Sequence, residues 1–219
     1  ASGLLVLAAS PAPGRYHLGL NWDAGQKPQL KISPDMTAAL KPQANGVDFD
    51  FDNPATLTPP KDAPPRYQWQ RIVEYSDFGD WPSVSRHFAP LYVKAAALPP
   101  ASPLRQEAAK IAAAHGRPLD RAAAALKLVQ QDVRYIYVGL NGGNLTPASA
   151  DETWQRRYGD CKGKTALLLA LLRELGIEAE PVLINSSGTD DGFDQRLAGP
   201  QLFTSGAKIE GIKPVWKGT

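Results

Sequence analysis

Cys161 is the residue of this chain best suited to covalent chemistry, because a cysteine thiolate is a strong nucleophile. It is the single cysteine in 219 residues, and it stands where a turn, 158–160, meets an almost wholly apolar run, 165–175. That run predicts a buried helix. A thiol in the first turn of such a helix lies near the positive end of the helix dipole, which stabilises its anion. Lys162 and Lys164 add positive charge beside it.

A structural interpretation of the same turn also remains open. A lone cysteine at a helix start is more often a small buried side chain than a nucleophile. Asp160 is expected to cap the helix by accepting hydrogen bonds from backbone N–H groups, which is a structural role. Gly159 is expected to end the preceding helix and to allow a backbone turn with positive φ. The role of Cys161 therefore depends on what lies opposite it.

The other titratable groups are weaker candidates for a site. Asp48, Asp50 and Asp52 alternate with apolar residues, so they are expected on the solvent face of an edge strand rather than around a cation. His115 falls at the end of an apolar helical stripe, where the helix dipole favours it. Nothing in the sequence places the remaining histidines and the carboxylates of a polar loop near Cys161: His17, His87, Asp190, Asp191 and Asp194.

The composition is that of an ordinary globular protein, with 43% apolar residues, 21% charged residues and a net charge of +2. No block of lysine and arginine is present, so a nucleic-acid partner is not expected. One cysteine excludes an internal disulfide and a cysteine-rich zinc site, and no cofactor or metal is predicted. The apolar run at 4–9 is far shorter than a membrane span. It also lacks the basic flank of a signal peptide, and a chain starting at Ala1 is expected to be a fragment or a mature form.

Proline divides the chain, since 15 of its 20 prolines lie in residues 1–103. Proline breaks helices, so this half is expected to be strand and loop. Five candidate strands are 3–8, 16–22, 29–32, 47–51 and 67–75, and the last shows the clearest alternation. In the last, Tyr67, Trp69, Val73 and Tyr75 share one face and Glu74 lies on the polar face.

The second half shows helical spacing. A helix is predicted from Trp81 to Leu91, and a second begins at a Ser102 cap. A third carries an apolar stripe, at residues 119, 122, 126, 129, 133 and 136, and should pack antiparallel to the second. The spacing from Ser149 to Glu152 is that of a capping box, which opens a short helix before the Cys161 turn. Strands are predicted at 178–185, 202–213 and 215–216.

The stretch 132–184 resembles the core of the transglutaminase-like superfamily. The resemblance rests on DVRYIYVGLNGGNLTPASADETWQRRYGDCKGKTALLLALLRELGIEAEPVLI, and above all on GDCKGK with the apolar helix after it. It implies an α+β, papain-like fold with a helix pair, a central helix bearing the catalytic Cys161, and a short antiparallel sheet. Bacterial relatives carry this core after an all-β N-terminal domain. Domains are therefore expected at 1–75, a partial Pro-rich all-β domain, and at 76–219, a core incomplete at its C-terminal end.

The resemblance also implies a triad in which a histidine and an aspartate on the next two strands serve the cysteine. Here Phe203 is followed by Thr204, Ser205 and Gly206, and Trp216 is followed by lysine and glycine, so neither partner is found. The implied function is a thiol-dependent amide hydrolase or acyl transferase acting on peptide or protein substrates. The alternatives are an inactive peptide- or protein-binding module and a truncated form of an active enzyme. The related proteins suggest the bacterial periplasm or cell envelope.

Overall fold

The computed structural model describes residues 1–63, 71–137, 145–185, 197–199 and 203–209. The chain divides into two compact units, one formed by 1–84 with 186–202 and the other by 85–185 with 203–219. The predicted α+β class is confirmed, with strands alone in most of the first half and helices with short sheets in the second. The domain limit expected at residue 75 stays a prediction. No helix among the described residues combines the length and hydropathy needed to cross a bilayer.

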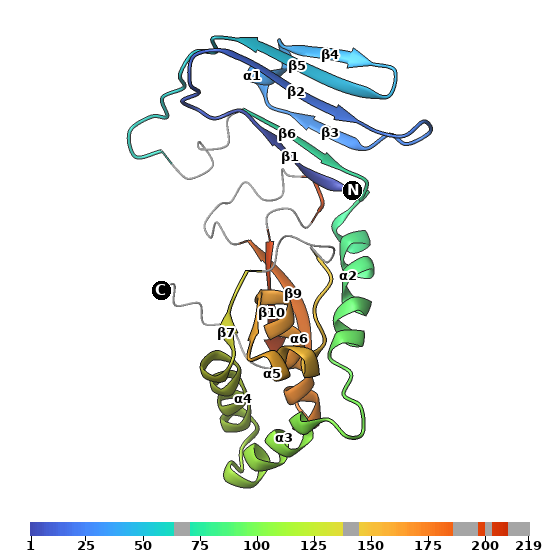
Figure 1. Ribbon diagram of the computed structural model, residues 1–219, viewed down its shortest axis with the longest axis vertical. Helices are drawn as coiled ribbons and strands as arrows, with labels where there is room; N and C mark the ends of the chain where they lie inside the picture. Colours follow the sequence, from blue (N-terminus) through green and yellow to red (C-terminus); the bar gives the residue numbers. More distant parts are fainter. Residues whose placement is uncertain (64–70, 138–144, 186–196, 200–202, 210–219) are drawn as a thin grey trace. The chain divides into compact units, whose positions relative to one another are not determined.

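The first unit is built from two antiparallel three-stranded sheets (Figure 1). One sheet has the strand order β1-β6-β3, and its strands are β1 (Ser2–Val6), β6 (Ile72–Ser76) and β3 (Gln29–Ile32). The other has the order β2-β5-β4, and its strands are β2 (Arg15–Asn21), β5 (Gly46–Asp52) and β4 (Leu40–Gln43). A single turn of helix, α1 (Pro34–Thr37), contributes the fully buried Met36. The core between these elements consists of Leu7, Met36, Val47, Phe49 and Val73.

One sequence expectation about this unit was wrong, and one polar residue is more buried than its place on the polar face suggests. β5 is the central strand of its sheet and not an edge strand, because β4, which the alternation pattern missed, pairs along its other side. Glu74 is 2% exposed and not on a solvated face, because residues from far along the chain cover it. Its carboxylate accepts a 2.9 Å hydrogen bond from the backbone N–H of Leu197, and the Ser76 hydroxyl donates to the Ala198 carbonyl. The predicted positions of Tyr67 and Trp69 lie outside the described residues.

The second unit is organised around α6 (Cys161–Glu174), which is drawn in orange in Figure 1. Helices α3, α4 and α5 and strands β9 and β10 all pack against it. The helices are α3 (Pro103–Ala114), α4 (Pro118–Asp132) and α5 (Ala150–Arg156), and α2 (Trp81–Ala95) precedes them. β9 (Ala179–Asn185) and β10 (Phe203–Ile209) form an antiparallel pair. Eight of the fourteen residues of α6 are buried, as its apolar sequence predicts.

The apolar stripe predicted across residues 119–136 is only partly correct. Ala122, Val129 and Val133 are buried, but Leu119 is 58% exposed and Leu126 is 42% exposed. Small alanines on the inner face of α4 occupy the places next to its neighbours, so two of the leucines face solvent. The helix ends at Asp132, and the chain then becomes a short strand, β7 (Arg134–Tyr135). This change from helix to strand decides what lies beside Cys161.

Candidate active site

The turn before Cys161 is fixed by caps on both sides. Ser149 caps α5 by accepting a 3.2 Å hydrogen bond from the backbone N–H of Glu152, as the capping-box spacing predicted. Arg157 ends α5 with a φ of 56°, and its guanidinium lies 3.5 Å from the centre of the Trp154 ring. The short strand β8 (Tyr158–Gly159) then leads directly into α6. The turn before Cys161 is therefore a compact helix–strand–helix connection.

Asp160 is the cap of α6, as expected from its position. Its side chain accepts hydrogen bonds of 3.0 and 3.1 Å from the backbone N–H groups of Lys162 and Gly163. Asp160 is 6% exposed, so these bonds compensate a carboxylate removed from water. Cys161 becomes the first residue of the helix, and it is partly exposed. A small filler residue is expected to be fully buried, so this exposure favours the interpretation of Cys161 as a chemical group.

The two lysines beside Cys161 both have other partners. The Lys162 ammonium pairs with the Asp160 carboxylate, and both side chains are nearly buried. The Lys164 ammonium donates a 2.6 Å hydrogen bond to the Val133 carbonyl, and burial lowers the pKa of this lysine. The sequence predicted that both charges would act on the thiol. The structure instead pairs one with the cap and uses the other to tie α6 to the end of α4.

A tyrosine that the sequence did not single out lies on the strand beside the Cys161 turn. β7 pairs with β8 in parallel, with Tyr135 opposite Gly159, and the Ile136 N–H donates a 3.1 Å hydrogen bond to the Gly159 carbonyl. This pairing places Tyr135 on the strand beside the Cys161 turn, and its phenol is near enough to feel the Cys161 side chain. Partial burial raises the pKa of Tyr135, and the neighbouring Cys161 and Asp160 side chains raise it further. The phenol therefore holds its proton more tightly than an isolated tyrosine does.

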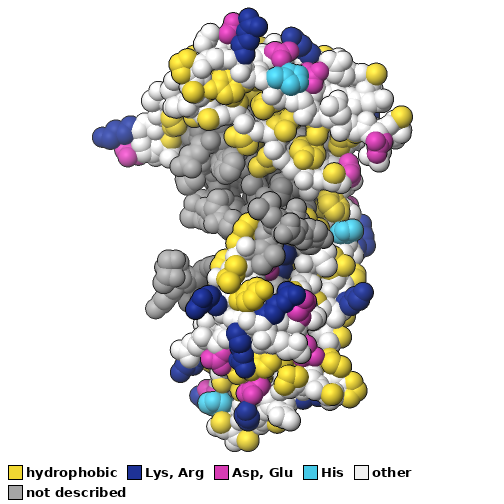
Figure 2. All heavy atoms as spheres, in the orientation of Figure 1, with side chains coloured by type: hydrophobic (Ala, Val, Ile, Leu, Met, Phe, Trp, Pro, Cys, Tyr) yellow, Lys and Arg dark blue, Asp and Glu magenta, His cyan; other side chains and the backbone are white. Residues whose placement is uncertain are grey.

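The surface around this pair is aromatic and basic. Tyr135, Ile136, Tyr137 and Tyr158 are 55%, 41%, 74% and 38% exposed, respectively. Figure 2 shows hydrophobic side chains among Lys and Arg side chains on one face of the second unit. The helical interpretation of 119–136 hid the run of Tyr135, Ile136 and Tyr137, which are aromatic and β-branched residues typical of a strand.

At two positions around Cys161, Gly159 and Gly163, a larger side chain would collide with a neighbouring residue. A Cβ on Gly159 would lie 2.9 Å from Thr153 Cγ2, and a Cβ on Gly163 would lie 2.8 Å from Thr153 Oγ1. Thr153 is 1% exposed and stands on α5, so these glycines allow α5 to approach the turn closely. The positive φ expected at Gly159 was wrong: Gly159 lies in a strand, and Arg157 takes the left-handed conformation.

The histidines lie on other elements. His115 follows α3 as its C-cap, as its place in the stripe predicted, and His87 stands on α2 with its ring 4.9 Å from that of Phe88. His17 belongs to β2 in the first unit. The β10 strand begins at Phe203, and the residues that follow it, Thr204 to Gly206, pair with β9. The loop carboxylates Asp190, Asp191 and Asp194 and the end of the chain at 210–219 lie outside the described residues.

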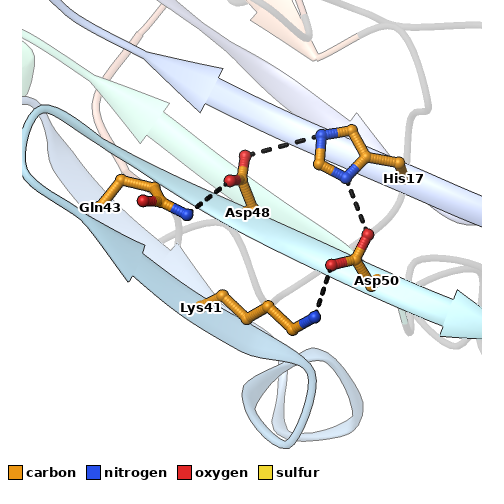
Figure 3. Close-up of polar contacts among 5 residues, drawn as sticks. All are labelled: His17, Lys41, Gln43, Asp48 and Asp50. Atoms are coloured by element: carbon orange, nitrogen blue, oxygen red, sulfur yellow. Dashed lines mark hydrogen bonds and ion pairs between the residues drawn. The ribbon is translucent and has the colours of Figure 1, made fainter.

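Asp48 and Asp50 of β5 form hydrogen bonds and ion pairs with side chains of the neighbouring strands (Figure 3). The Asp50 carboxylate contacts His17 Nδ1 at 2.8 Å and Lys41 Nζ at 2.7 Å, and Asp48 accepts a 2.8 Å hydrogen bond from Gln43. Asp50 raises the pKa of His17, while Lys41 and His17 lower that of Asp50. In the described part of the chain no three acidic, histidine or cysteine side chains are grouped as metal ligands.

Known proteins resemble this chain in sequence and in fold. A crystal structure of a putative protease from Parabacteroides distasonis is 13% identical, with a TM-score of 0.65, over 90% of this chain and 38% of that one. The chain thus spans well under half of that protein, and at this identity the likeness shows the fold alone. A putative cysteine protease from Cytophaga hutchinsonii is 15% identical, with a TM-score of 0.37, over 96% of this chain and 68% of that one. No curated protein matches the chain.

The sequence comparison with protein families agrees with the site. The family model described as the transglutaminase-like superfamily matches residues 105–206, a stretch that begins within α3, contains α4, α5, the Cys161 turn, α6 and β9, and ends within β10. The chain therefore contains a transglutaminase-like domain at residues 105–206.

Proposed function

We propose that the second unit is a thiol-dependent amide hydrolase or acyl transferase, with Cys161 as its nucleophile and peptides or proteins as its substrates. The observation that carries this proposal is the position of Cys161. It is a partly exposed thiol at the first residue of a capped helix whose interior is buried. The positive end of the helix dipole favours the thiolate there. Tyr135, on the strand that pairs with β8, lies near enough for its phenol to interact with the thiol.

The reaction proceeds by acyl transfer through the sulfur. The thiolate attacks the carbonyl carbon of an amide, a C–S bond forms, and the carbonyl π electrons move to the oxygen. When the carbonyl reforms, the C–N bond breaks and the amine takes a proton from solvent water, so that a thioester and hydroxide remain. Water or a second amine then attacks the thioester, which releases an acid or a new amide and returns Cys161. The expected donation from the Cys161 backbone N–H to the oxyanion stays a prediction.

The leaving amine of an amide substrate needs a proton donor, and the supply of that proton limits the expected rate of amide turnover. The position after Phe203 that the family assigns to the triad histidine holds Thr204. Loss of a triad partner leaves on the order of a thousandth of the rate or less. We therefore expect slow turnover of amides and much faster acylation by activated esters, whose leaving groups depart without a proton.

A second candidate is a peptide- or protein-binding module that has lost turnover. It is favoured by the same observation, that Thr204, Ser205 and Gly206 stand where the histidine is expected. The two candidates differ in whether a thioester forms on Cys161. Binding of a peptide without any acylation of the thiol would support the second.

The decisive experiment follows the acyl group. The whole chain is mixed with p-nitrophenyl acetate, and intact mass and released nitrophenol are measured with time. Wild type should gain one acetyl group faster than N-acetylcysteine amide at the same pH, and Cys161→Ala should gain none. A glutamine peptide with hydroxylamine then tests amide transfer, with hydroxamate and ammonia as products. Acetylation no faster than that of the free thiol would exclude the enzymatic role.

A further inference from the structure

Tyr135 stands next to Cys161 because of backbone pairing and not by chance proximity on the surface. The Arg134 N–H donates a 2.8 Å hydrogen bond to the Arg157 carbonyl, and the Ile136 N–H donates one of 3.1 Å to the Gly159 carbonyl. Tyr135 lies between these two bonds, paired with Gly159 in the parallel ladder. Its backbone is therefore held on both sides at the strand that leads into Cys161.

The anchoring of this strand extends into α6. The ammonium of Lys164 donates to the carbonyl of Val133, the residue just before β7. The position of β7 is thus tied to the first turns of α6 by a side-chain bond as well as by the ladder with β8. A phenol carried by such a strand keeps a defined direction toward the first residue of that helix.

We propose that the Tyr135 hydroxyl is a catalytic donor that holds the Cys161 sulfur and stabilises its thiolate. The inference builds on the proposed role of Cys161 as nucleophile. A phenol that donates to a sulfur anion forms a charge-assisted hydrogen bond, which is stronger than a bond between neutral groups. As the C–S bond forms, the sulfur loses its negative charge, so a hydrogen bond from the hydroxyl to the sulfur becomes weaker. The hydroxyl keeps its proton throughout and becomes free to donate to the carbonyl oxygen as that atom gains charge.

The two lysines of α6 nearest Cys161 are engaged by other groups. On α6 itself, the Lys162 ammonium is paired with Asp160, and the Lys164 ammonium donates to a carbonyl. From the segment after β7, Tyr137 also lies near enough for its charge to influence Tyr135, but it is 74% exposed. Tyr137 is therefore a matched control, with the same side chain two residues away on the same segment.

The test measures the pH dependence of thiol–disulfide exchange without any amide substrate. Wild type, Tyr135→Phe and Tyr137→Phe react with dithiodipyridine, and released thiopyridone is followed by absorbance from pH 4 to 10. Only one thiol is present, so each chain releases one equivalent. Far-UV circular dichroism confirms that each variant is folded. Tyr135→Phe keeps the ring and removes only one oxygen from a side chain that is 55% exposed.

Loss of the donor should raise the midpoint of the Tyr135→Phe profile by about one pH unit. Because a more basic thiolate is also more nucleophilic, the exchange should be about threefold slower below the midpoint and about threefold faster on the plateau. The two profiles should therefore cross, whereas Tyr137→Phe should follow wild type. A ring that merely covered the sulfur would leave the midpoint in place, so coincident midpoints for wild type and Tyr135→Phe would overturn the inference.

A second measurement follows the ionisation of the tyrosines. The phenolate absorbance of wild type and Cys161→Ala is titrated, and removal of the sulfur should let one tyrosine ionise at lower pH. Identical titrations would contradict the pairing even if Tyr135→Phe did not fold. Because neither measurement uses a substrate, a negative acylation assay would refute only the proposed function. Unchanged titrations would refute only the role of Tyr135 as a donor.

Discussion

Substitution of Gly163 by alanine tests the close approach of α5 to the start of α6. The new Cβ would lie 2.8 Å from Thr153 Oγ1, whereas ordinary contacts begin at 3.4 Å, so the overlap is 3.4 − 2.8 = 0.6 Å. Thr153 is 1% exposed and cannot swing into solvent. Either α5 or the first turn of α6 must move, and Cys161 moves with that turn.

Two opposing effects set the magnitude. Overpacking of this kind typically costs about 1–3 kcal/mol. Alanine is favoured over glycine within a helix by up to about 1 kcal/mol. The expected net loss for Gly163→Ala is therefore about 1 kcal/mol, within a range of about 0–2 kcal/mol. In a Thr153→Ala background the obstacle is gone, so the same substitution should stabilise the protein by up to about 1 kcal/mol.

The assay is urea unfolding followed by far-UV circular dichroism, to which the helices of the second unit contribute most. Wild type, the two single variants and the double variant form a cycle whose coupling free energy should be about 1–3 kcal/mol. Gly116→Ala is the matched control, because nothing lies within 4 Å of its added Cβ. Equal effects of Gly163→Ala in both backgrounds, within about 0.5 kcal/mol, would refute the steric argument.

Three further predictions concern caps and charges. Asp160→Ala should lower the free energy of unfolding by about 1–2 kcal/mol in thermal or urea unfolding, since it removes the α6 cap, whereas Asp160→Asn should retain much of it. The pKa of His17, measured by NMR, should lie above 6.5 and fall in Asp50→Asn. Because the folded pKa is raised, this pair stabilises the fold fully below the unfolded pKa, and the contribution is lost as pH rises through the folded pKa; an unshifted His17 titration would contradict the contact. Ser102→Ala should cost about 1 kcal/mol, because Ser102 caps α3 and donates to Asp151, and an unchanged melting temperature would argue against both bonds.

Features that depend on neighbours in the sequence were predictable. Four of the five strands proposed for the first half are present, and 29–32 matches β3 at both ends. The fifth, 67–75, overlaps β6 at 72–75, while residues 67–70 lie outside the described residues. The caps at Ser102, Ser149 and Asp160 are each confirmed by a side-chain oxygen that accepts a backbone N–H two or three residues later. Such bonds are local, so the residue type and the spacing are sufficient to predict them.

Features that depend on distant pairing were not predictable. The alternation of β5 indicates a strand but not how many strands flank it, so its central position was missed. Glu74 matches a solvent-facing pattern, yet Leu197 and Ala198 cover its strand. Periodicity likewise extended the helix of α4 across Val133 to Ile136, because a stripe of apolar residues does not reveal where the chain leaves the helix to pair with β8.

The candidate site divides in the same way. The sequence by itself predicted that Cys161 follows a capped turn at the start of a buried helix, because the start of a helix depends on a few adjacent residues. Only the tertiary structure decided what meets the thiol. The β7–β8 pairing brought Tyr135 to the sulfur, while Asp160 and the Val133 carbonyl engaged the two lysines. Contacts between segments remote in sequence depend on strand register and helix packing, and no local pattern encodes these.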